Sequence, residues 1–149
     1  MPVVWKMQLS TGNDLIDLDH KYLIALFNSV ELALSKPENL KFLPVFFRQL
    51  VDYTREHFAR EEVIQVKIKY PYYADHKIEH QNIVEHLENV YSRIQDVMGA
   101  GDTEVTPEQI HEQLDAEIIS LAREWVIDHL VKTDAKMALF LRKHPHDLS

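Results

Sequence analysis

Two potential metal ligands, His57 and Glu61, stand four residues apart in the stretch DYTREHFAREEVI, residues 52–64. Residues at this spacing share one face of a helix, with about 5–6 Å between their Cβ atoms. Leu50 and Ile64 fall on the same face, which is therefore the apolar one. Polar side chains directed into a core are costly unless something satisfies them, and a metal ion does so. The stretch therefore predicts a helix whose buried face carries metal ligands.

Three further groups of potential ligands occupy the apolar faces of other helical stretches. His20 stands alone, whereas His76 and His80 are again four residues apart. His129 and Asp134 are five residues apart. At 3.6 residues per turn this spacing rotates Asp134 away from His129 by about 140°. We expect a side chain so displaced to reach a second ion to one side of the first.

Five histidines and two carboxylates are too many ligands for one ion and suit two. If both carboxylates bridge and a bridging oxygen is shared, the ion with three histidines is closed, whereas the ion with two histidines keeps one open position. A single histidine on an apolar face is more often a hydrogen-bonded core residue, but four groups on four helices favour an unequal metal pair that binds a small molecule. Four other histidines lack a partner on a core face and are expected to be solvated, His86, His111, His144 and His146.

Apolar residues recur at helical spacing along four segments, and no segment alternates polar and apolar residues convincingly over the length of a strand. The expected helices cover about residues 15–35, 37–65, 71–98 and 107–143. Ser35 and Glu38 resemble a capping box at the start of the second helix. Because the connections are short, we predict an all-α fold, an antiparallel up-down-up-down four-helix bundle. Residues 1–149 form a single domain in this prediction, with residues 1–14 as an N-terminal arm.

Length, charge and composition limit the possible functions. The chain of 149 residues suits one domain, and its formal net charge of −8 argues against binding to nucleic acid or to an anionic membrane. The absence of cysteine leaves imidazole and carboxylate as metal ligands, and imidazole suits zinc, copper, iron or nickel. The sequence shows neither an apolar run of about 18 residues nor a secretory signal, so we expect a cytoplasmic location.

The ligand pattern and its flanking residues resemble those of the hemerythrins, most closely the bacterial hemerythrin-like domains. The resemblance covers nearly the whole chain and fills all seven ligand positions with the expected residue type. The matching stretches, several of which contain ligands, are Trp5, Gly12, Ile16–Lys21, Leu23, Asn28, residues 57–62, Tyr70-Pro71, residues 76–80, and residues 125–129 with Asp134. The resemblance implies a non-haem di-iron site with Fe²⁺ and Fe³⁺ states and an oxo or hydroxo bridge, which binds dioxygen reversibly. Nitric oxide is a second ligand for the same ferrous position.

The resemblance also implies a role for each site residue. The coordinatively full iron takes three histidines, His76, His80 and His129. The iron with the open position takes two histidines, His20 and His57. Two carboxylates bridge the irons, Glu61 and Asp134. Apolar side chains line the dioxygen pocket and exclude water and protons, which slows oxidation of the site; they are Leu23, Phe58, Trp125, Val126 and Leu130.

Three positions depart from the family pattern without removing a ligand. Gln65 stands where the family often carries methionine or another apolar residue, and it either faces solvent or admits water nearer the iron. Asp19 precedes His20 where glutamine or glutamate is usual, which changes a hydrogen bond behind a ligand. Asn13 replaces a commonly apolar residue of the arm.

The implied role is a dioxygen-responsive domain, either an oxygen or redox sensor input module or an oxygen carrier. A sensor would continue into a C-terminal signalling output domain in the full-length protein. The alternatives are a di-iron enzyme, such as a peroxidase or oxidase of a small molecule, and an iron store or scavenger. Ferritin-like di-iron proteins use paired Glu-x-x-His motifs, which differ from the His-x-x-x-Glu and His-x-x-x-His of this chain. We therefore expect no enzymatic function beyond weak oxidase or peroxidase activity.

Overall fold

The computed structural model describes residues 3–99 and 107–149, and every regular element within them is a helix. Three long α-helices come first, α1 (Asp14–Ser35), α2 (Leu43–Lys67) and α3 (Tyr73–Gly99). The fourth long segment consists of α4 (Pro107–Ala122), the π-helix η3 (Arg123–Thr133) and α5 (Asp134–Leu141), which follow one another without a break. Two short 3₁₀ helices, η1 (Met7–Leu9) and η2 (Pro37–Phe42), precede α1 and α2. None of the described helices is long and apolar enough to cross a membrane.

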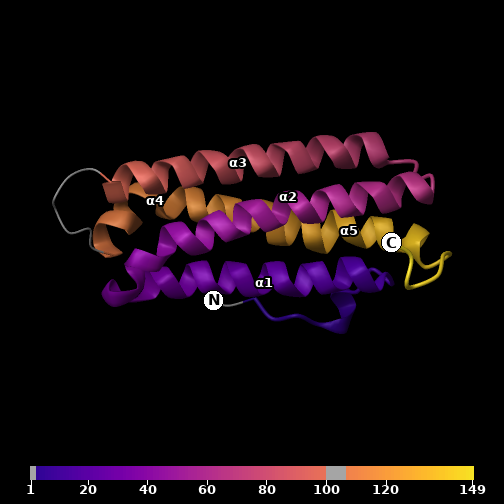
Figure 1. The fold of residues 1–149 in the computed structure, drawn as a ribbon, viewed down its shortest axis with the longest axis horizontal. Helices are drawn as coiled ribbons and strands as arrows, with labels where there is room; N and C mark the ends of the chain where they lie inside the picture. Colours follow the sequence, from indigo (N-terminus) through magenta and orange to yellow (C-terminus); the bar gives the residue numbers. More distant parts are fainter. Residues whose placement is uncertain (1–2, 100–106) are drawn as a thin grey trace.

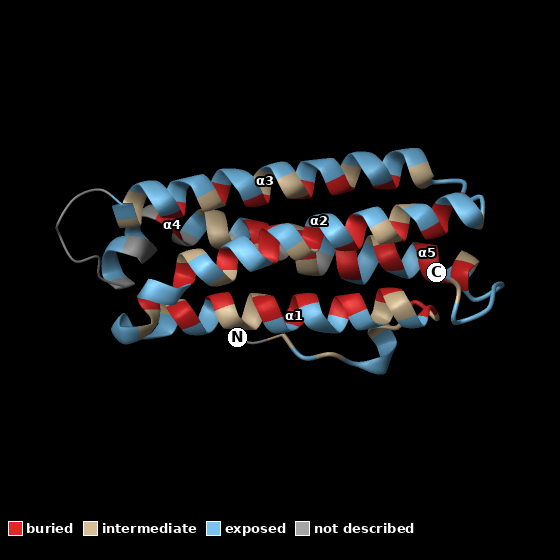
Figure 2. Cartoon of the chain, viewed as in Figure 1, coloured by how far each residue is buried: buried red, intermediate tan, exposed pale blue. Residues whose placement is uncertain are grey.

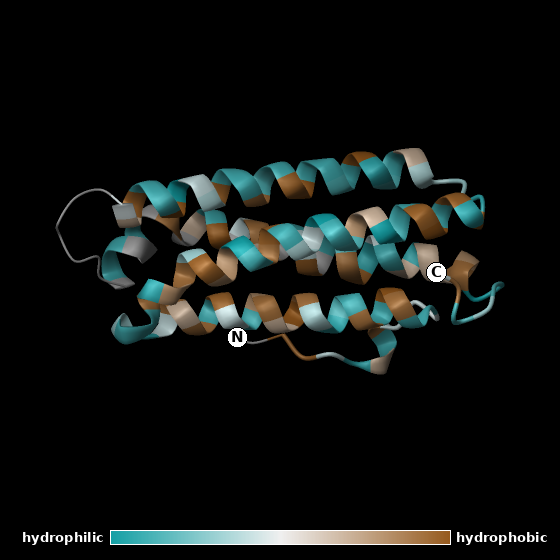
Figure 3. Cartoon of the chain, in the orientation of Figure 1, coloured by the Kyte–Doolittle hydropathy of each residue, from teal (hydrophilic) through white to brown (hydrophobic). Residues whose placement is uncertain are grey.

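The four long segments lie side by side along the long axis of the molecule (Figure 1). α1 packs on α2, α2 on α3 and α3 on α4, and contacts between α1 and α4 close the ring. Buried residues form a stripe along one face of each helix (Figure 2). Apolar residues follow the stripes less strictly, because polar residues occupy part of the buried face (Figure 3). The helices are therefore amphipathic around a shared interior that contains a polar layer.

A side-chain cap fixes the start of α1. Asn13 Oδ1 accepts a hydrogen bond from the backbone N–H of Ile16 at 3.0 Å, which satisfies one of the free amides of the first turn. Asp14 and Asp17 add negative charge where the helix dipole favours it. The Asn13 side-chain amide also donates to the carbonyl of Leu148 at 2.8 Å and so fastens the C-terminal tail to α1. The polar residue at position 13 thus has two roles that an apolar residue could not fill.

The second long helix begins later than the sequence predicts. Pro37–Phe42 forms the 3₁₀ helix η2, and α2 starts only at Leu43. The capping box expected from Ser35 and Glu38 is not formed, because the Ser35 hydroxyl donates to the carbonyl of Leu32 (2.7 Å) at the end of α1. A proline lies in the first turn of α2, where its missing N–H would have had no partner within the helix.

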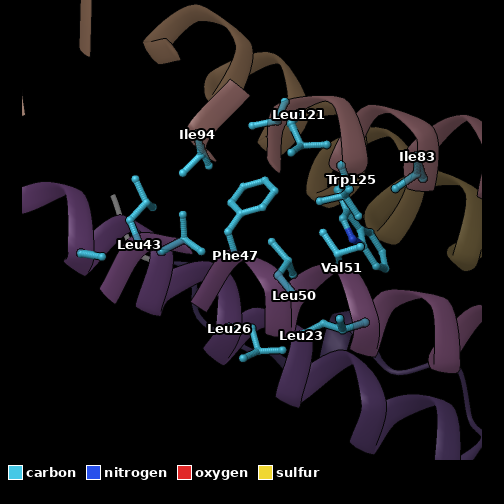
Figure 4. Packing of buried hydrophobic residues seen from close by; sticks show 14 of the residues in the cluster. Leu23, Leu26, Leu43, Phe47, Leu50, Val51, Ile83, Ile94, Leu121 and Trp125 are labelled. Carbon is cyan, nitrogen blue, oxygen red and sulfur yellow. The ribbon is translucent and has the colours of Figure 1, made fainter. Parts of the chain in front are cut away.

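Two apolar clusters fill the interior. The larger one is built from all four segments and surrounds Phe47, Leu50 and Trp125 (Figure 4). The smaller one lies where α1 begins and where α2 and α5 end, and consists of Ile16, Ile64, Tyr70, Met137 and Leu141. On α2, Glu61 falls between Phe58 of the larger cluster and Ile64 of the smaller one. The predicted ligands therefore occupy a layer between two apolar regions.

The chain before α1 runs along that helix (Figure 1). Val3 and Asn28 exchange two hydrogen bonds of 2.8 Å, one through the backbone N–H of Val3 and one through its carbonyl. The Lys21 ammonium lies 5.2 Å from the centre of the Trp5 ring. The backbone N–H of Thr11 donates to a carboxylate oxygen in the first turn of α1 at 2.8 Å. These contacts hold the described part of this segment against α1.

Candidate metal centre

The structure brings all seven sequence-predicted ligands together in the interior, and none of their side chains is more than 2% exposed. Each of the four long segments contributes to the group. The residues are His20 from α1, His57 and Glu61 from α2, His76 and His80 from α3, His129 from η3 and Asp134 from α5. Two overlapping subsets lie close enough to hold a metal ion, one with His76, His80, His129 and Glu61, the other with His20, His57 and Glu61.

The two oxygens of Glu61 face different histidines. Oε1 lies 2.9 Å from Nε2 of His76 and 3.2 Å from Nε2 of His80. Oε2 lies 3.0 Å from Nε2 of His57 and 3.7 Å from Nε2 of His20. The carboxylate therefore stands between a group of histidines on α3 and a group on α1 and α2.

Asp134 divides its oxygens in the same way. Its Oδ1 lies 3.2 Å from Nε2 of both His76 and His129. Its Oδ2 lies 3.2 Å from Nε2 of His20. The Nε2 atoms of His80 and His129 are themselves 3.2 Å apart. Taken together, one oxygen from each carboxylate faces the group of three histidines, His76, His80 and His129, and the other oxygens face the group of two, His20 and His57. Two unequal metal ions would require this arrangement.

Many polar atoms of this group have no hydrogen-bond partner in the described part of the chain. These atoms include both carboxylate oxygens of Glu61 and of Asp134, and Nε2 of His20, His57 and His76. A buried polar atom without a partner costs free energy, and a buried carboxylate costs more. Cations at the centre would meet this cost, because imidazole nitrogens and carboxylate oxygens are suitable metal ligands. The residues present therefore fit a metal centre.

The fourth segment brings His129 and Asp134 together by changing its helix type. The backbone N–H of Asp134 donates to the carbonyl of His129, an i→i+5 bond that is typical of a π-helix. The expectation that an α-helix would turn Asp134 aside is therefore wrong. Both side chains point to the same centre, because the wider turn of Arg123–Thr133 compensates for the five-residue spacing. Such π turns are rare and frequently occur at functional sites.

The carboxylates change the proton affinity of the imidazoles. Burial acts to lower the pKa of His20 and His76, but the close contacts with the carboxylates of Asp134 and Glu61, and their negative charge, raise the pKa of each to about 10. Burial likewise opposes the charge of His129, whose pKa is nevertheless raised to about 9. Burial acts to raise the pKa of both carboxyls, yet the histidines hold them well below their usual range. Without a metal, protonated imidazoles therefore balance the negative charge of the carboxylates, and metal binding must release these protons.

Three of the five imidazoles have a carboxylate behind them. Such an outer partner orients a metal-binding histidine and makes it a better ligand. The pairs are His57 Nδ1 with Asp19 Oδ2 at 2.9 Å, His80 Nδ1 with Glu62 Oε2 at 3.1 Å, and His129 Nδ1 with Glu79 Oε1 at 3.1 Å. Sequence reasoning missed Glu62 and Glu79. The available signal was their position in the chain, since each directly follows or precedes a predicted ligand on the same helix.

Asp19 is the centre of the most extensive of these outer contacts. Besides His57, it accepts hydrogen bonds from the Tyr53 hydroxyl at 2.6 Å and from Nε and Nη2 of Arg60, both at 2.9 Å. Burial acts to raise the pKa of the Asp19 carboxyl, but the hydrogen bonds from His57, Arg60 and Tyr53 hold it well below its usual range. The shorter aspartate at this position is therefore a charged, fully bonded partner for His57.

The predicted pocket residues differ in how closely they approach the imidazoles. The Phe58 ring stacks on His80, with 3.7 Å between the ring centres and 5° between the planes. Trp125 meets His129 edge to face at 5.3 Å, and its indole N–H donates to the Thr54 hydroxyl at 3.3 Å. Leu23 and Leu130 are buried in the same apolar cluster as these rings, whereas Val126 is half-buried.

The histidines outside the predicted ligand set occupy different environments. His86, which we expected to be solvated, is only partly exposed and pairs with Glu124 at 2.7 Å. His144 and His146 are exposed, and His146 pairs with Asp14 at 2.6 Å. The side chain of His111 lies outside the described residues.

Gln65 is buried rather than exposed. Its amide nitrogen donates to the sulfur of Met137 at 3.1 Å. The sequence left two possibilities for Gln65, that it faces solvent or that it admits water nearer the iron. The first is wrong, because the side chain is buried.

Comparison with known proteins identifies the family. The family model described as the hemerythrin HHE cation binding domain matches residues 11–141. The chain belongs to the hemerythrin family. It is similar to the bacteriohemerythrin of Stenotrophomonas maltophilia, with 27% identity over 95% of this chain and 83% of that protein. Bacteriohemerythrin of Pseudomonas aeruginosa is 28% identical over 89% of this chain and 77% of its own length.

A third relative supports the same assignment across a wider range of bacteria. Bacteriohemerythrin of Campylobacter jejuni is 24% identical over 89% of this chain and 90% of its own length. No solved structure matches the chain. The hemerythrin match covers α1, α2 and α3 and the whole fourth segment, so the cation-binding description applies to the part of the chain that contains the buried histidines.

Proposed function

We propose that the seven buried residues bind two iron ions and that this hemerythrin domain binds dioxygen reversibly. One iron would be held by His76, His80 and His129, and the other by His20 and His57. Glu61 and Asp134 would bridge them, together with an oxo or hydroxo group. The observation that carries the proposal is the division of both carboxylates between a three-histidine group and a two-histidine group.

The proposal includes the predicted topology, an antiparallel up-down-up-down bundle with an N-terminal arm. Two observations support it. The described connections, from α1 to α2 and from α2 to α3, lie at opposite ends of the molecule (Figure 1), and the segment containing Val3 and Trp5 contacts α1. A single domain from residue 1 to residue 149 is part of the same proposal.

The iron pair, when bound, supplies the reversible redox chemistry that dioxygen binding requires. The protein supplies orientation and the exclusion of water. Asp19 would fix the ring of His57, so the two-histidine side would be held rigidly although it has fewer ligands. Phe58 and Trp125 cover His80 and His129 with apolar rings. An apolar wall keeps water and protons from the centre and so slows irreversible oxidation.

The domain would act as a sensor input module or as an oxygen carrier, and its rate of oxidation in air distinguishes the two. A carrier must stay reduced through many cycles of loading, whereas rapid oxidation without turnover favours a sensor. Binding of nitric oxide, a C-terminal output domain and a cytoplasmic location stay predictions from the sequence. Sustained turnover of a substrate with peroxide or dioxygen would favour the di-iron enzyme instead.

The proposal is tested by metal analysis and optical spectroscopy of the purified protein. We expect two irons per chain and a visible band that changes when the reduced protein meets air. Glu61→Ala should lose iron, because both metal positions lose an oxygen ligand. His86→Ala is the matched control and should keep its iron, since its imidazole pairs with Glu124 instead. One zinc per chain, no spectral change in air, or equal iron content in the two variants would contradict the proposal.

A further inference from the structure

Gln65 is a fully buried polar residue in an otherwise apolar part of the bundle. Three residues beside it, Ile64, Tyr70 and Met137, belong to the smaller apolar cluster. A buried amide costs free energy unless its donors and its acceptor are hydrogen-bonded. The presence of a glutamine here is therefore explained only if its amide binds something.

Met137 fixes the orientation of this amide. Nε2 of Gln65 lies 3.1 Å from Sδ of Met137, and a thioether sulfur is an acceptor, so the amide donates to it. The reversed amide would place two acceptors against each other. The carbonyl oxygen Oε1 is therefore free to accept from another group, and it has no hydrogen-bond partner among the described residues.

Two imidazoles of the metal centre lack any polar contact at their outer nitrogen. Nδ1 of His20 and Nδ1 of His76 are buried and make no hydrogen bond within residues 3–99 and 107–149. Nδ1 of His129 also makes no hydrogen bond, but a carboxylate oxygen of Glu79 lies 3.1 Å from it. The other three imidazoles each have a carboxylate at this position. A histidine that binds metal through one nitrogen generally donates its other N–H to a carboxylate, a carbonyl or a water molecule. Unused donors and one unused acceptor thus occur in the same region.

Tyr70 links Gln65 to this end of the metal centre. Its backbone N–H donates to the main-chain carbonyl of Gln65 at 2.9 Å, and its ring meets the His76 ring edge to face, with 6.0 Å between the ring centres. Gln65 also follows Glu61 by about one turn on the same buried face of α2. A water molecule joins an acceptor and a donor through two hydrogen bonds, each about 2.8 Å between heavy atoms.

We propose that Gln65 binds an internal water molecule, which accepts the outer N–H of His20 or His76 and donates to Gln65 Oε1. The water would use a donor and an acceptor that are otherwise unpaired, as buried waters in proteins do. Gln65 is then a positioning residue for a metal-binding histidine and acts on it through the water. The effect on metal binding rests on the proposed function, whereas the water itself does not.

The first test measures the affinity for Fe²⁺ without oxygen, by competition with a chelator. Gln65→Met removes the acceptor and should bind Fe²⁺ about 10–100-fold more weakly, the usual effect of losing an outer partner of a ligand. Gln65→Glu keeps an acceptor oxygen and should stay close to the wild type. Gln49→Met is the matched control, because it makes the same exchange at an exposed position of α2. Equal affinities of the wild type and Gln65→Met would overturn the proposal.

The second test locates the water in crystal structures of the zinc-loaded wild type and Gln65→Met. We expect a water within about 3.2 Å of Gln65 Oε1 and of Nδ1 of His20 or His76, and none at that position in Gln65→Met. A wild-type structure without this water overturns the proposal whatever the iron content. A wild type that binds no pair of metal ions overturns the proposed function instead, so the two failures are distinguishable.

Melting of the metal-free proteins separates the proposal from a simple packing defect. If Gln65 were only a misplaced polar group, methionine would raise the melting temperature by about 2–4 °C, the shift expected for a modest gain in a domain of this size. We expect no rise, because the variant leaves an imidazole N–H without its acceptor. A rise of that size in Gln65→Met, but not in Gln49→Met, would contradict the proposal.

Discussion

The two regions of the interior are equally buried but differ in what their atoms require. Around Phe47, Leu50 and Leu87 the side chains are apolar, at most 1% exposed, and are satisfied by packing alone. Two turns further along the same face of α2, His57 and Glu61 are as deeply buried, yet Nε2 and both carboxylate oxygens lack hydrogen-bond partners in the described residues. Burial therefore has opposite energetic effects at two places on the same helix. The apolar region stabilises the fold, whereas the polar layer costs free energy until cations or protons neutralise it.

The largest expected effect is on the free energy of unfolding, when a side chain is removed from the apolar region. Phe47→Ala should lower the free energy of unfolding by about 3–5 kcal/mol, since it deletes a fully buried ring and leaves a cavity. The iron content of the folded variant should stay at the wild-type level. Urea unfolding and metal analysis measure the two quantities. Leu139→Ala, at a site that is 61% exposed, is the control and should change stability by no more than about 0.5 kcal/mol.

Metal removal tests the polar layer. At free metal a thousandfold above its dissociation constant, binding should stabilise the protein by roughly 4 kcal/mol. This corresponds to a rise in melting temperature of about 8–16 °C for a domain of this size. Asp134→Ala removes a ligand oxygen from both sides of the centre, and its melting temperature should respond little to metal. If the wild type melts at the same temperature with and without metal, the claim that cations stabilise the polar layer is wrong.

The pH dependence of the metal-free protein probes the same layer more gently. In the folded chain the pKa of His20 and of His76 is about 10, well above the unfolded value near 6.5, so their contribution to stability is complete below about pH 6.5. It declines as the pH rises towards 10. The carboxyls of Glu61 and Asp134 have lowered pKa values, so their contribution is present above about pH 4.5 and is lost in acid.

Thermal unfolding of the metal-free protein at pH 6 and pH 9 measures this prediction. The melting temperature should be lower at pH 9 by at least roughly 3 °C, the change expected from about 1 kcal/mol. Metal affinity should change in the opposite direction, because protons compete with the metal for the imidazoles. Asp134→Ala should show a smaller difference between the two pH values. An equal difference in that variant would place the titrating groups outside the polar layer.

The smallest expected effect concerns the boundary between the regions. Thr54 is buried and accepts the indole N–H of Trp125 at 3.3 Å. Thr54→Val keeps the shape of the side chain and removes that acceptor, so we expect a loss of about 1 kcal/mol in the free energy of unfolding. Urea unfolding followed by tryptophan fluorescence measures it. Unchanged stability would indicate that the indole N–H finds another partner.

The sequence predicts correctly those features that depend only on residue type and on which residues share one face of a helix. The spacing of His57 and Glu61, and of His76 and His80, predicts residues on one face of an α-helix, and the structure places each pair in one buried group. The helical class followed for the same reason, because the apolar stripes repeat with the period of an α-helix. Neither inference needed knowledge of which helices are neighbours.

The missed features depend on contacts between segments or on a choice between helix types. Glu62 and Glu79 look like solvated charges until the packing of α2 and η3 against α3 brings them to His80 and His129. The direction of Gln65 depends on the position of Met137, which is 72 residues further along the chain. At Pro37–Phe42, the Ser35 hydroxyl donates to the carbonyl of Leu32 in the preceding helix and does not cap the segment that follows, which forms a 3₁₀ helix. Helical periodicity contains none of this information.

The π-helix of the fourth segment also determines how the gene can vary in length. Deleting one residue between His129 and Asp134 would give the pair the four-residue spacing of His57 and Glu61, which an ordinary α-helix places on one face. Arg123–Thr133 therefore offers two chain lengths that keep both side chains together, one with the wide turn and one without it. α2 contains no wide turn between its own pair, so a deletion there brings His57 and Glu61 three residues apart with no change of helix type to compensate. A deletion of one codon is thus absorbed by a change of helix type in the fourth segment and not in α2.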